Sequence, residues 1–474
     1  MKSTKLASII IFGWMVLLPV CARSQESRVL IVHLRGVPES KISVMPLTGP
    51  KAFKPVADAS AVNSGATAFL VVPMEYLPGE FMLQFDSKNG ESAKTSPSQK
   101  NIFINNQDLE LWINPSYTDS TRFQEGELEN NAFAQFSKQN EKKKQQLVVL
   151  NDFLMNYEAK QSGFYQQALK EYEQQRVAHN QSLRSAEKRD QKLFVSSIYQ
   201  LNYIPTTPFT GSEQDKIKGV IQHYFDGMNF RDTLVIKTAQ IIKWMDAYVN
   251  LHGRLSTTMA LRDSLFPAAA RSAIEKARTG HPLMYGWMVD YFYRGFESNN
   301  LLAGIKVLEQ YTSDPNCLTA KRIQIEKRLK GMKSLTVGTI PPNIILNDPT
   351  GNRFDLSKAQ MGSNLILLLF YSADCGHCTD LIKELKPWLD GLPASGRPEV
   401  VAISLDDTEI DIKRWSQLIT GLPDWKHLRA NGISSPVAND YFLLSTPVMI
   451  LLDSKTKEIL ALPSSFNELK NNIK

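Results

Sequence analysis

Two cysteines separated by two residues, Cys375 and Cys378, are the most chemically informative pair in this 474-residue sequence. A continuous apolar run, 365–370, precedes them and an amphipathic stretch follows. Two sulfurs at this spacing can close a disulfide at a helix start, where unpaired N–H groups stabilise a thiolate at the first position. The pattern predicts a redox-active dithiol in which Cys375 attacks a partner disulfide and Cys378 resolves the mixed disulfide.

Three neighbours of the first cysteine should tune its reactivity. Gly376 and His377 stand between the sulfurs, and a protonated His377 stabilises a thiolate. This dipeptide predicts a better oxidant than a sequence with proline at position 377. Asp374 directly precedes Cys375, and its negative charge opposes thiolate formation.

Zinc binding is the main alternative chemistry for a pair at this spacing. Zinc normally takes four ligands, and only His427 lies downstream as a further candidate. The strand before the pair and the helix after it also favour a redox site. We therefore expect no metal and no bound cofactor, the Cys375–Cys378 disulfide being the only redox group.

The N-terminus has the three parts of a secretory signal. A basic start, an apolar centre and small residues predict a signal peptide over residues 1–24. A membrane anchor is disfavoured because the apolar run is shorter than the roughly 20 residues of a spanning helix. A lipid-modified Cys21 is disfavoured because Leu18-Pro19-Val20 lacks the usual small residues. We expect export to the periplasm or cell envelope, with no transmembrane segment in the mature chain.

Composition and length describe a multidomain globular protein. The chain is 43% apolar and 22% charged, and its formal charge of +6 is too small and dispersed to favour nucleic-acid binding. Short alternating runs separated by turn formers predict a small all-β, sandwich-like domain over 25–115. Apolar residues at three- and four-residue spacing predict an all-α domain over 120–333, with a break near Gly163.

Several elements can be expected within these regions. In the all-α domain we expect helices over the following ranges: 217–229, 233–251, 259–278, 283–297 and 318–330. The last follows Cys317, a lone thiol that we interpret as a buried small residue. The alternative is a third redox cysteine that resolves a mixed disulfide. Residues 335–474 read as an α/β domain with a hairpin over 344–356. Its further elements are strands over 365–370, 400–405 and 448–452, a helix over 409–419, and a strand over 457–462 that pairs with the one before it.

Residues 335–474 resemble the envelope thioredoxins of the TlpA/ResA kind. The features that match are Val337-Gly338, Phe354-Asp355-Leu356 after the hairpin, the buried strand, the CxxC and Thr446-Pro447. The resemblance implies a thioredoxin-like fold and a cis bond before Pro447. It also implies that Thr446 and Pro447 dock the backbone of a partner. The whole layout is similar to multidomain exported thioredoxin-like proteins of Bacteroidetes-type bacteria.

The sequence departs from this family at several positions. Asp374 stands where thioredoxins usually have Trp, and Leu369 and Leu381 stand where the family has buried proton-relay acids. Asp380 and Glu384 would face elsewhere on the helix. The sequence therefore offers no acid to take the proton of the second cysteine.

Two functions from different classes follow. The first is a thiol–disulfide oxidoreductase that exchanges disulfides with protein thiols of the cell envelope, with its upstream redox partner and its direction of electron flow open. The second is an envelope binding or scaffold protein with an auxiliary thioredoxin domain, because the first 330 or so residues carry no catalytic signal. A peroxiredoxin is disfavoured because Leu368 and Ser372 stand where its site needs Pro and Thr.

Overall fold

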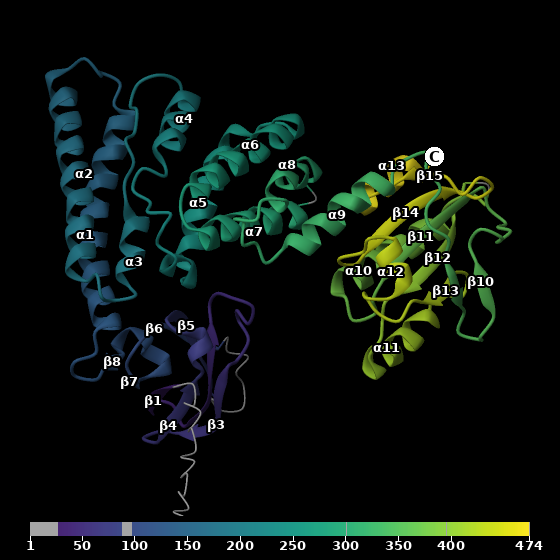
Figure 1. The fold of residues 1–474 in the computed structure, drawn as a ribbon, viewed down its shortest axis with the longest axis horizontal. Helices are drawn as coiled ribbons and strands as arrows, with labels where there is room; N and C mark the ends of the chain where they lie inside the picture. Colours follow the sequence, from purple (N-terminus) through teal and green to yellow (C-terminus); the bar gives the residue numbers. More distant parts are fainter. Residues whose placement is uncertain (1–26, 88–96, 300, 395, 474) are drawn as a thin grey trace, which may run out of the picture. The chain divides into compact units, whose positions relative to one another are not determined.

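The computed structural model describes residues 27–87, 97–299, 301–394 and 396–473 (Figure 1). The expected signal peptide and Cys21 lie outside these residues. No helix in the described ranges is both long enough and apolar enough to cross a membrane. The chain divides into two compact units, whose segments alternate along the sequence. The first comprises Met1–Phe209, Asp226–Met228 and Leu234–Trp244, and the second comprises Thr210–Phe225, Asn229–Thr233 and Met245–Lys474.

The first unit contains two four-stranded sheets packed face to face. Their strand orders are β4-β1-β7-β8 and β3-β2-β5-β6. The strands are β1 (Arg28–Leu34), β2 (Glu39–Pro46), β3 (Ala57–Asn63), β4 (Thr67–Val72), β5 (Gly79–Ser87), β6 (Ser98–Ile104), β7 (Leu109–Ile113) and β8 (Arg122–Phe123). Alternate residues such as Leu30, Phe81 and Leu111 fill the space between the sheets. The prediction of a β-rich N-terminal region is confirmed.

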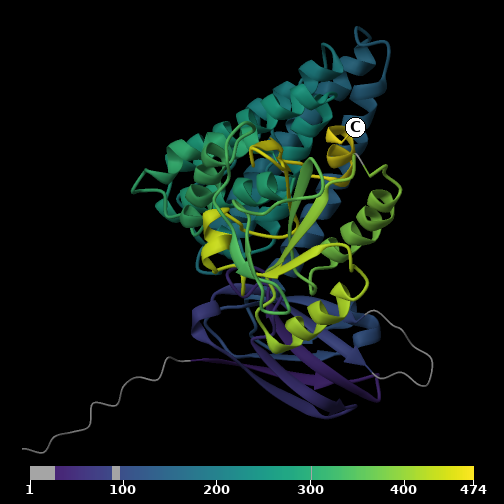
Figure 2. The same ribbon diagram turned by 90° about the vertical axis from the view of Figure 1, so that its right-hand side faces the viewer.

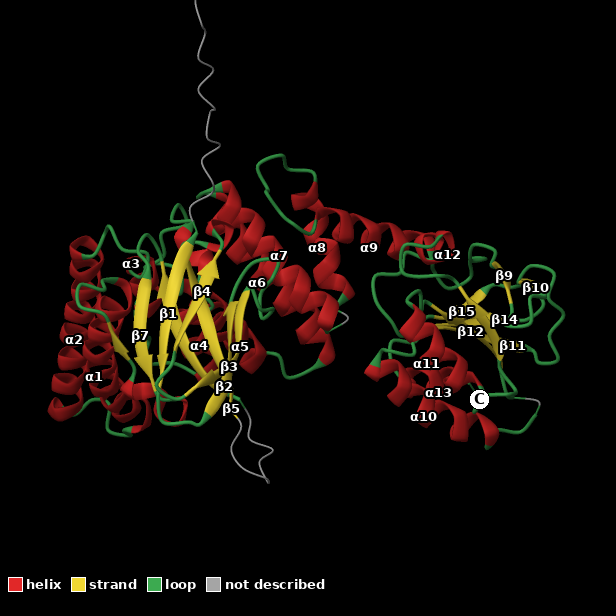
Figure 3. Cartoon of the chain, turned by 90° about the horizontal axis from the view of Figure 1, so that it is seen from below, coloured by secondary structure: helices red, strands yellow, loops and turns green. Residues whose placement is uncertain are grey.

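The outer faces of these two sheets differ. Phe103 of β6 packs with Phe136 and Tyr199, which belong to helices that contact the sheet β3-β2-β5-β6 at its edge strand β6. These helices are α1 (Glu129–Asn156), α2 (Gly163–Arg189) and α3 (Ser196–Tyr199). Within the first unit no described helix covers the outer face of the opposite sheet (Figure 3). Phe69 of β4 is 67% exposed on that face.

The helical middle region is confirmed, with helix starts that differ from three predictions. Its further helices are α4 (Glu213–His223), α5 (Gln240–Leu255), α6 (Met259–Arg278), α7 (Pro282–Ser298), α8 (Leu302–Thr312) and α9 (Arg322–Ser334). The helix predicted over 217–229 spans Glu213–His223, because the Ser212 side chain caps it by accepting from the Asp215 N–H. The helix predicted from 233 starts at Gln240, because the buried Glu80 carboxylate accepts hydrogen bonds from the Thr238 hydroxyl and the Ala239 N–H. The helix predicted from 318 starts at Arg322, because Asp290 binds the Ala320 N–H in the same way.

The C-terminal region is an α/β layer structure, as predicted (Figure 2). Its five-stranded sheet has the order β13-β12-β11-β14-β15. The strands are β11 (Leu365–Tyr371), β12 (Glu399–Ser404), β13 (Lys426–Arg429), β14 (Val448–Asp453) and β15 (Ile459–Ala461). The first three are parallel and the last two antiparallel to their neighbours. The predicted hairpin is present as β9 (Ile345–Asn347) and β10 (Arg353–Asp355). Strand β13 was not predicted from the sequence.

Both faces of this sheet are buried, which explains why β11 is a continuous apolar run. Leu368 and Phe370 pack toward α12 (Pro436–Asp440) and the hairpin. Leu367, Leu369 and Tyr371 pack on the other face, toward α10 (Gly376–Asp390), α11 (Glu409–Ile419) and α13 (Phe466–Asn472). The strand that precedes the dithiol is therefore held on both sides.

Candidate active site

The two cysteines lie at the first turn of α10 in unlike surroundings. Cys375 is the N-cap residue and is half-buried, whereas Cys378 is fully buried beside Ile382 and Leu385. The Cys378 N–H donates to the Cys375 carbonyl at 3.1 Å, and both sulfurs are free thiols. The first sulfur is therefore partly accessible to solvent and the second is shielded from it.

Burial dominates the acidity of the second cysteine. Burial, and after it the neighbouring Cys375 side chain, raise the pKa of Cys378 to about 12. Hydrogen bonds with the Thr446 side chain and the Ser372 backbone oppose this increase in pKa. Cys378 is therefore a neutral thiol in the reduced protein at neutral pH.

The loop before β14 lies against the first cysteine. The Thr446–Pro447 peptide bond is cis, as predicted. The Cys375 sulfur lies 3.6 Å from the Thr446 carbonyl oxygen, because β14 pairs with β11 and brings the ends of the two loops together. The structure thus brings this pair next to the dithiol, and its docking of a partner backbone stays a prediction.

Asp374 has a partner that the sequence analysis did not foresee. Its carboxylate forms an ion pair with the Arg414 guanidinium of α11, and both side chains are more than half exposed. This cation offsets the negative charge that we expected to oppose a thiolate at Cys375. Gly376 and His377 are exposed in the first turn of α10.

A buried carboxylate, Asp406, supports the chain just before the dithiol. It is 2% exposed and accepts hydrogen bonds from the Ser372 hydroxyl at 2.6 Å, the Ala373 N–H at 3.0 Å and the Ser404 hydroxyl at 2.6 Å. The sequence analysis missed it. One signal was available, since Asp406 directly follows a buried strand parallel to β11, and polar residues at the carboxyl ends of such strands often build sites.

A buried polar pair lies on the same face of the sheet as Cys378. The Trp415 indole N–H donates to the Tyr371 hydroxyl at 2.9 Å and links α11 to β11. Burial raises the pKa of Tyr371, and the nearby Asp406 and Cys378 raise it further. Tyr371 therefore remains a neutral phenol and contributes no negative charge beside the second cysteine.

The positions of the family's relay acids hold apolar side chains. Leu369 is fully buried, and Leu381 packs against the same core. Asp380 is exposed and pairs with Lys383 at 2.9 Å, and Glu384 is exposed as well. In the described ranges, no group of three or more His, Cys, Asp or Glu side chains is arranged to hold a metal ion.

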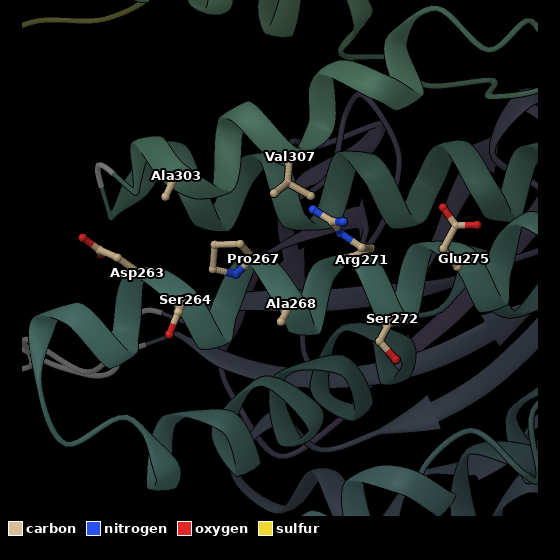
Figure 4. Close-up of a pocket in the computed structure, with 9 residues that line it drawn as sticks. All are labelled: Asp263, Ser264, Pro267, Ala268, Arg271, Ser272, Glu275, Ala303 and Val307. Atoms are coloured by element: carbon tan, nitrogen blue, oxygen red, sulfur yellow. The ribbon is translucent and has the colours of Figure 1, made fainter.

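A hollow of about 590 Å³ lies between α6 and α8 of the second unit (Figure 4). Its charged lining residues are Asp263, Arg271 and Glu275, all on α6. None of the residues predicted for the redox site lines it. Cys317 is also separate from the dithiol in sequence and is fully buried, and burial raises its pKa to about 11.

Comparisons with known proteins find thioredoxin-like structures. No family model and no curated relative matches the sequence. A thioredoxin-like protein from Bacteroides caccae is 17% identical, with a TM-score of 0.39, covering 56% of this chain and 96% of that one. A thiol-disulfide oxidoreductase from Bacteroides fragilis is 25% identical, with a TM-score of 0.24, covering 28% and 96%. A thio-disulfide isomerase from Thermus thermophilus is 15% identical, with a TM-score of 0.23, covering 29% and 93%.

Proposed function

We propose that this protein is an extracytoplasmic thiol–disulfide oxidoreductase that exchanges disulfides with exported proteins through Cys375 and Cys378. One observation carries the proposal: an accessible sulfur at a helix start, with a second, fully buried sulfur in the same helical turn. A disulfide with only a structural role does not require one sulfur to be accessible and the other buried. The Thr446 carbonyl beside the first sulfur supports a partner-docking role for the Thr446-Pro447 loop.

The proposed exchange conserves electrons and protons. The Cys375 thiolate attacks one sulfur of a partner disulfide, and the other partner sulfur leaves as a thiolate. Cys378 then loses its proton and attacks the Cys375 sulfur, which releases the second partner thiolate. The partner gains two electrons and, after protonation, two thiols, while Cys375 and Cys378 become a disulfide. Run in reverse, the same steps oxidise a partner dithiol.

Three features support efficient attack by the first cysteine. The N–H groups of the first turn of α10 favour a thiolate at the N-cap position. Arg414 offsets the charge of Asp374. A protonated His377 adds a positive charge in the same turn. Partners are protein thiols and disulfides in the periplasm or cell envelope, to which residues 1–24 direct the chain.

An insulin-reduction assay tests the activity. The mature chain should precipitate insulin in the presence of dithiothreitol, and Cys375→Ser should abolish the activity above background. Cys317→Ser serves as the matched control and should retain it, because that thiol is buried elsewhere. Full activity in Cys375→Ser would rule the proposal out.

Trapping in cell-envelope extracts tests the partner class. Cys378→Ser cannot resolve the mixed disulfide and should accumulate covalent complexes that dithiothreitol releases. The double change Cys375→Ser/Cys378→Ser should give none. If the single variant also gives none, the envelope scaffold reading is favoured over the oxidoreductase.

A further inference from the structure

A row of four side chains crosses the outer face of the sheet β4-β1-β7-β8. No described helix of the first unit covers this face (Figure 3). The strand register places Thr67, His33, Trp112 and Arg122 side by side, one from each strand. Directly paired residues share a face of a sheet, and Leu34 and Ile113 next to this row are buried in the sandwich core. The four side chains therefore stand on the outer face.

His33 is held in place from both sides of its ring. Its Nε2 atom lies 2.7 Å from a Glu110 carboxylate oxygen, and its Nδ1 atom lies 2.8 Å from the Thr67 hydroxyl. The ring stacks on the Trp112 indole with centroids 4.7 Å apart and planes 10° apart. The indole is thereby fixed before any ligand arrives, so little conformational entropy is lost when a ligand packs on it.

Beside this indole lies a hollow of about 580 Å³ with a positive lining. Arg35 and Arg122 both line it and both are exposed. Neither guanidinium forms an ion pair with a carboxylate among the residues that the structure describes. Two uncompensated cations at one hollow attract an anion, and a guanidinium fork matches the geometry of a carboxylate.

Two neutral polar side chains and the apolar Ile113 and Phe123 complete the lining. Asn114 and Ser120 also border the hollow, and the Ser120 hydroxyl donates to the Tyr117 carbonyl at 2.7 Å. Because the hydroxyl is the donor in this bond, its oxygen can still accept a hydrogen bond from a ligand. An amide and a hydroxyl are suited to bind neutral polar substituents of a ligand.

We propose that this hollow binds a small ligand that carries a carboxylate beside a ring with an apolar face, either the C–H face of a sugar or the face of an aromatic ring. The carboxylate pairs with Arg35 and Arg122, and the ring packs against Trp112. Ring substituents meet Asn114 and Ser120. The same chemistry is offered by two sources, an acidic sugar and an aromatic acid. This site lies wholly in the first unit, so the proposal does not depend on the redox activity.

Calorimetric titration of the full mature chain at low salt tests the site. The probes are digalacturonate for the acidic sugar and phenylacetate for the aromatic acid, each with its neutral counterpart, galactobiose and 2-phenylethanol. One acid should bind, and its neutral counterpart should bind about tenfold more weakly or worse, since the charge-assisted bonds are lost. Arg35→Gln/Arg122→Gln should weaken binding of the acid by a similar factor.

Matched variants separate the site from general charge effects. Arg184→Gln/Lys188→Gln removes two exposed cations from α2 and should leave the affinity unchanged. Trp112→Phe should weaken binding a few-fold, with thermal unfolding recorded for every variant to exclude misfolding. Binding of digalacturonate would identify the sugar as the source, and binding of phenylacetate the aromatic acid. Absence of binding for both acids, or equal affinity in Arg35→Gln/Arg122→Gln and the wild type, would overturn the proposal.

Discussion

Cys378 must become a thiolate to complete the proposed exchange, and its surroundings oppose that form. The sulfur is fully buried against Ile382 and Leu385, and burial raises its pKa to about 12. No relay acid lies at positions 369 or 381 to take its proton. Resolution of the mixed disulfide should therefore be the slow step at neutral pH.

A pH series measures this step. We expect the resolution rate to rise by close to tenfold per pH unit between about pH 7 and 9, because the thiolate fraction rises by that factor below the pKa. A mixed disulfide of Cys375 with thionitrobenzoate releases a coloured thiol when Cys378 attacks, so absorbance follows the rate. Cys378→Ser should release no colour. A rate independent of pH over this range would contradict a buried, unassisted thiol.

Asp406 is the second residue whose role can be isolated. Asp406→Asn replaces one acceptor oxygen with an NH₂ group, which faces the hydroxyl or N–H donors of Ser372, Ala373 and Ser404. We expect about 1–3 kcal/mol of lost stability in urea unfolding, since buried donors lose their acceptor. The loop before Cys375 should also loosen and lower the rate of insulin reduction.

Asp407→Asn is the matched control for that change. This neighbour is exposed and carries the same charge, so its loss should change stability by no more than about 0.5 kcal/mol. Equal effects from the two variants would show that net charge, and not the buried hydrogen bonds, explains the change.

At the scale of elements, α11 supplies a charge to the start of α10. Arg414→Gln leaves the Asp374 carboxylate uncompensated beside Cys375. The attack on a model disulfide should slow by about twofold to fivefold at low salt, because a nearby negative charge disfavours the thiolate. Both side chains are exposed, so added salt should shrink the difference.

A neighbouring lysine provides the control for α11. Lys413→Gln removes a cation from the same helix, and Lys413 makes no ion pair with Asp374 in the part of the chain that the structure describes. The rate at which the Lys413→Gln variant attacks the model disulfide should stay within about a factor of two of the wild-type rate. If Lys413→Gln and Arg414→Gln slow the attack equally, the specific pair with Asp374 is not the cause.

Element boundaries were predictable where local signals decide them. The helix predicted over 409–419 has these bounds, because the Thr408 side chain caps it by accepting from the Asp411 N–H. The helices predicted from 233 and 318 start later, at Gln240 and Arg322, because the distant carboxylates of Glu80 and Asp290 bind backbone N–H groups before the helix starts. No local sequence pattern indicates that a distant carboxylate will bind these N–H groups.

At the scale of the whole molecule, three buried histidines should make the protein sensitive to acid. Burial lowers the pKa of His252 to about 4, and it lowers the pKa values of His179 and His427 as well. His179 belongs to the first unit and the other two to the second. Each folded-state pKa lies below the unfolded value. The contribution of these neutral imidazoles to the free energy of unfolding is therefore fully present above about pH 6.5 and is lost as the pH falls toward 4.

His252→Phe tests the largest of these contributions. Both ring nitrogens of His252 lack a hydrogen-bond partner, and the ring contacts Tyr248 edge-on. When the pH is lowered from 6.5 to 4, the free energy of unfolding should fall in both proteins. The fall should be smaller in the variant, by up to about 3 kcal/mol. Urea unfolding at several pH values measures both curves. Parallel curves for the two proteins would contradict a buried neutral histidine.

The row on the outer sheet face also belongs to this larger scale. His33, Thr67, Trp112 and Arg122 are far apart in the sequence, and none of them was predicted to form a site. The register of β1 with β4 and β7 brings them together. Strand register depends on pairings between distant segments, so the spacing of the residues could not reveal it.

The sequence alone determined the dithiol, the strand before it and the helix after it, because local patterning specifies them. The cis Thr446–Pro447 bond was implied by the resemblance to envelope thioredoxins. Only the tertiary structure decided what surrounds the sulfurs. Arg414 reaches Asp374 from forty residues away, and Asp406 is buried behind Ser372. Charge and burial at a site are sums over neighbours in space, and neighbours in space are set by the packing of the sheet and its helices.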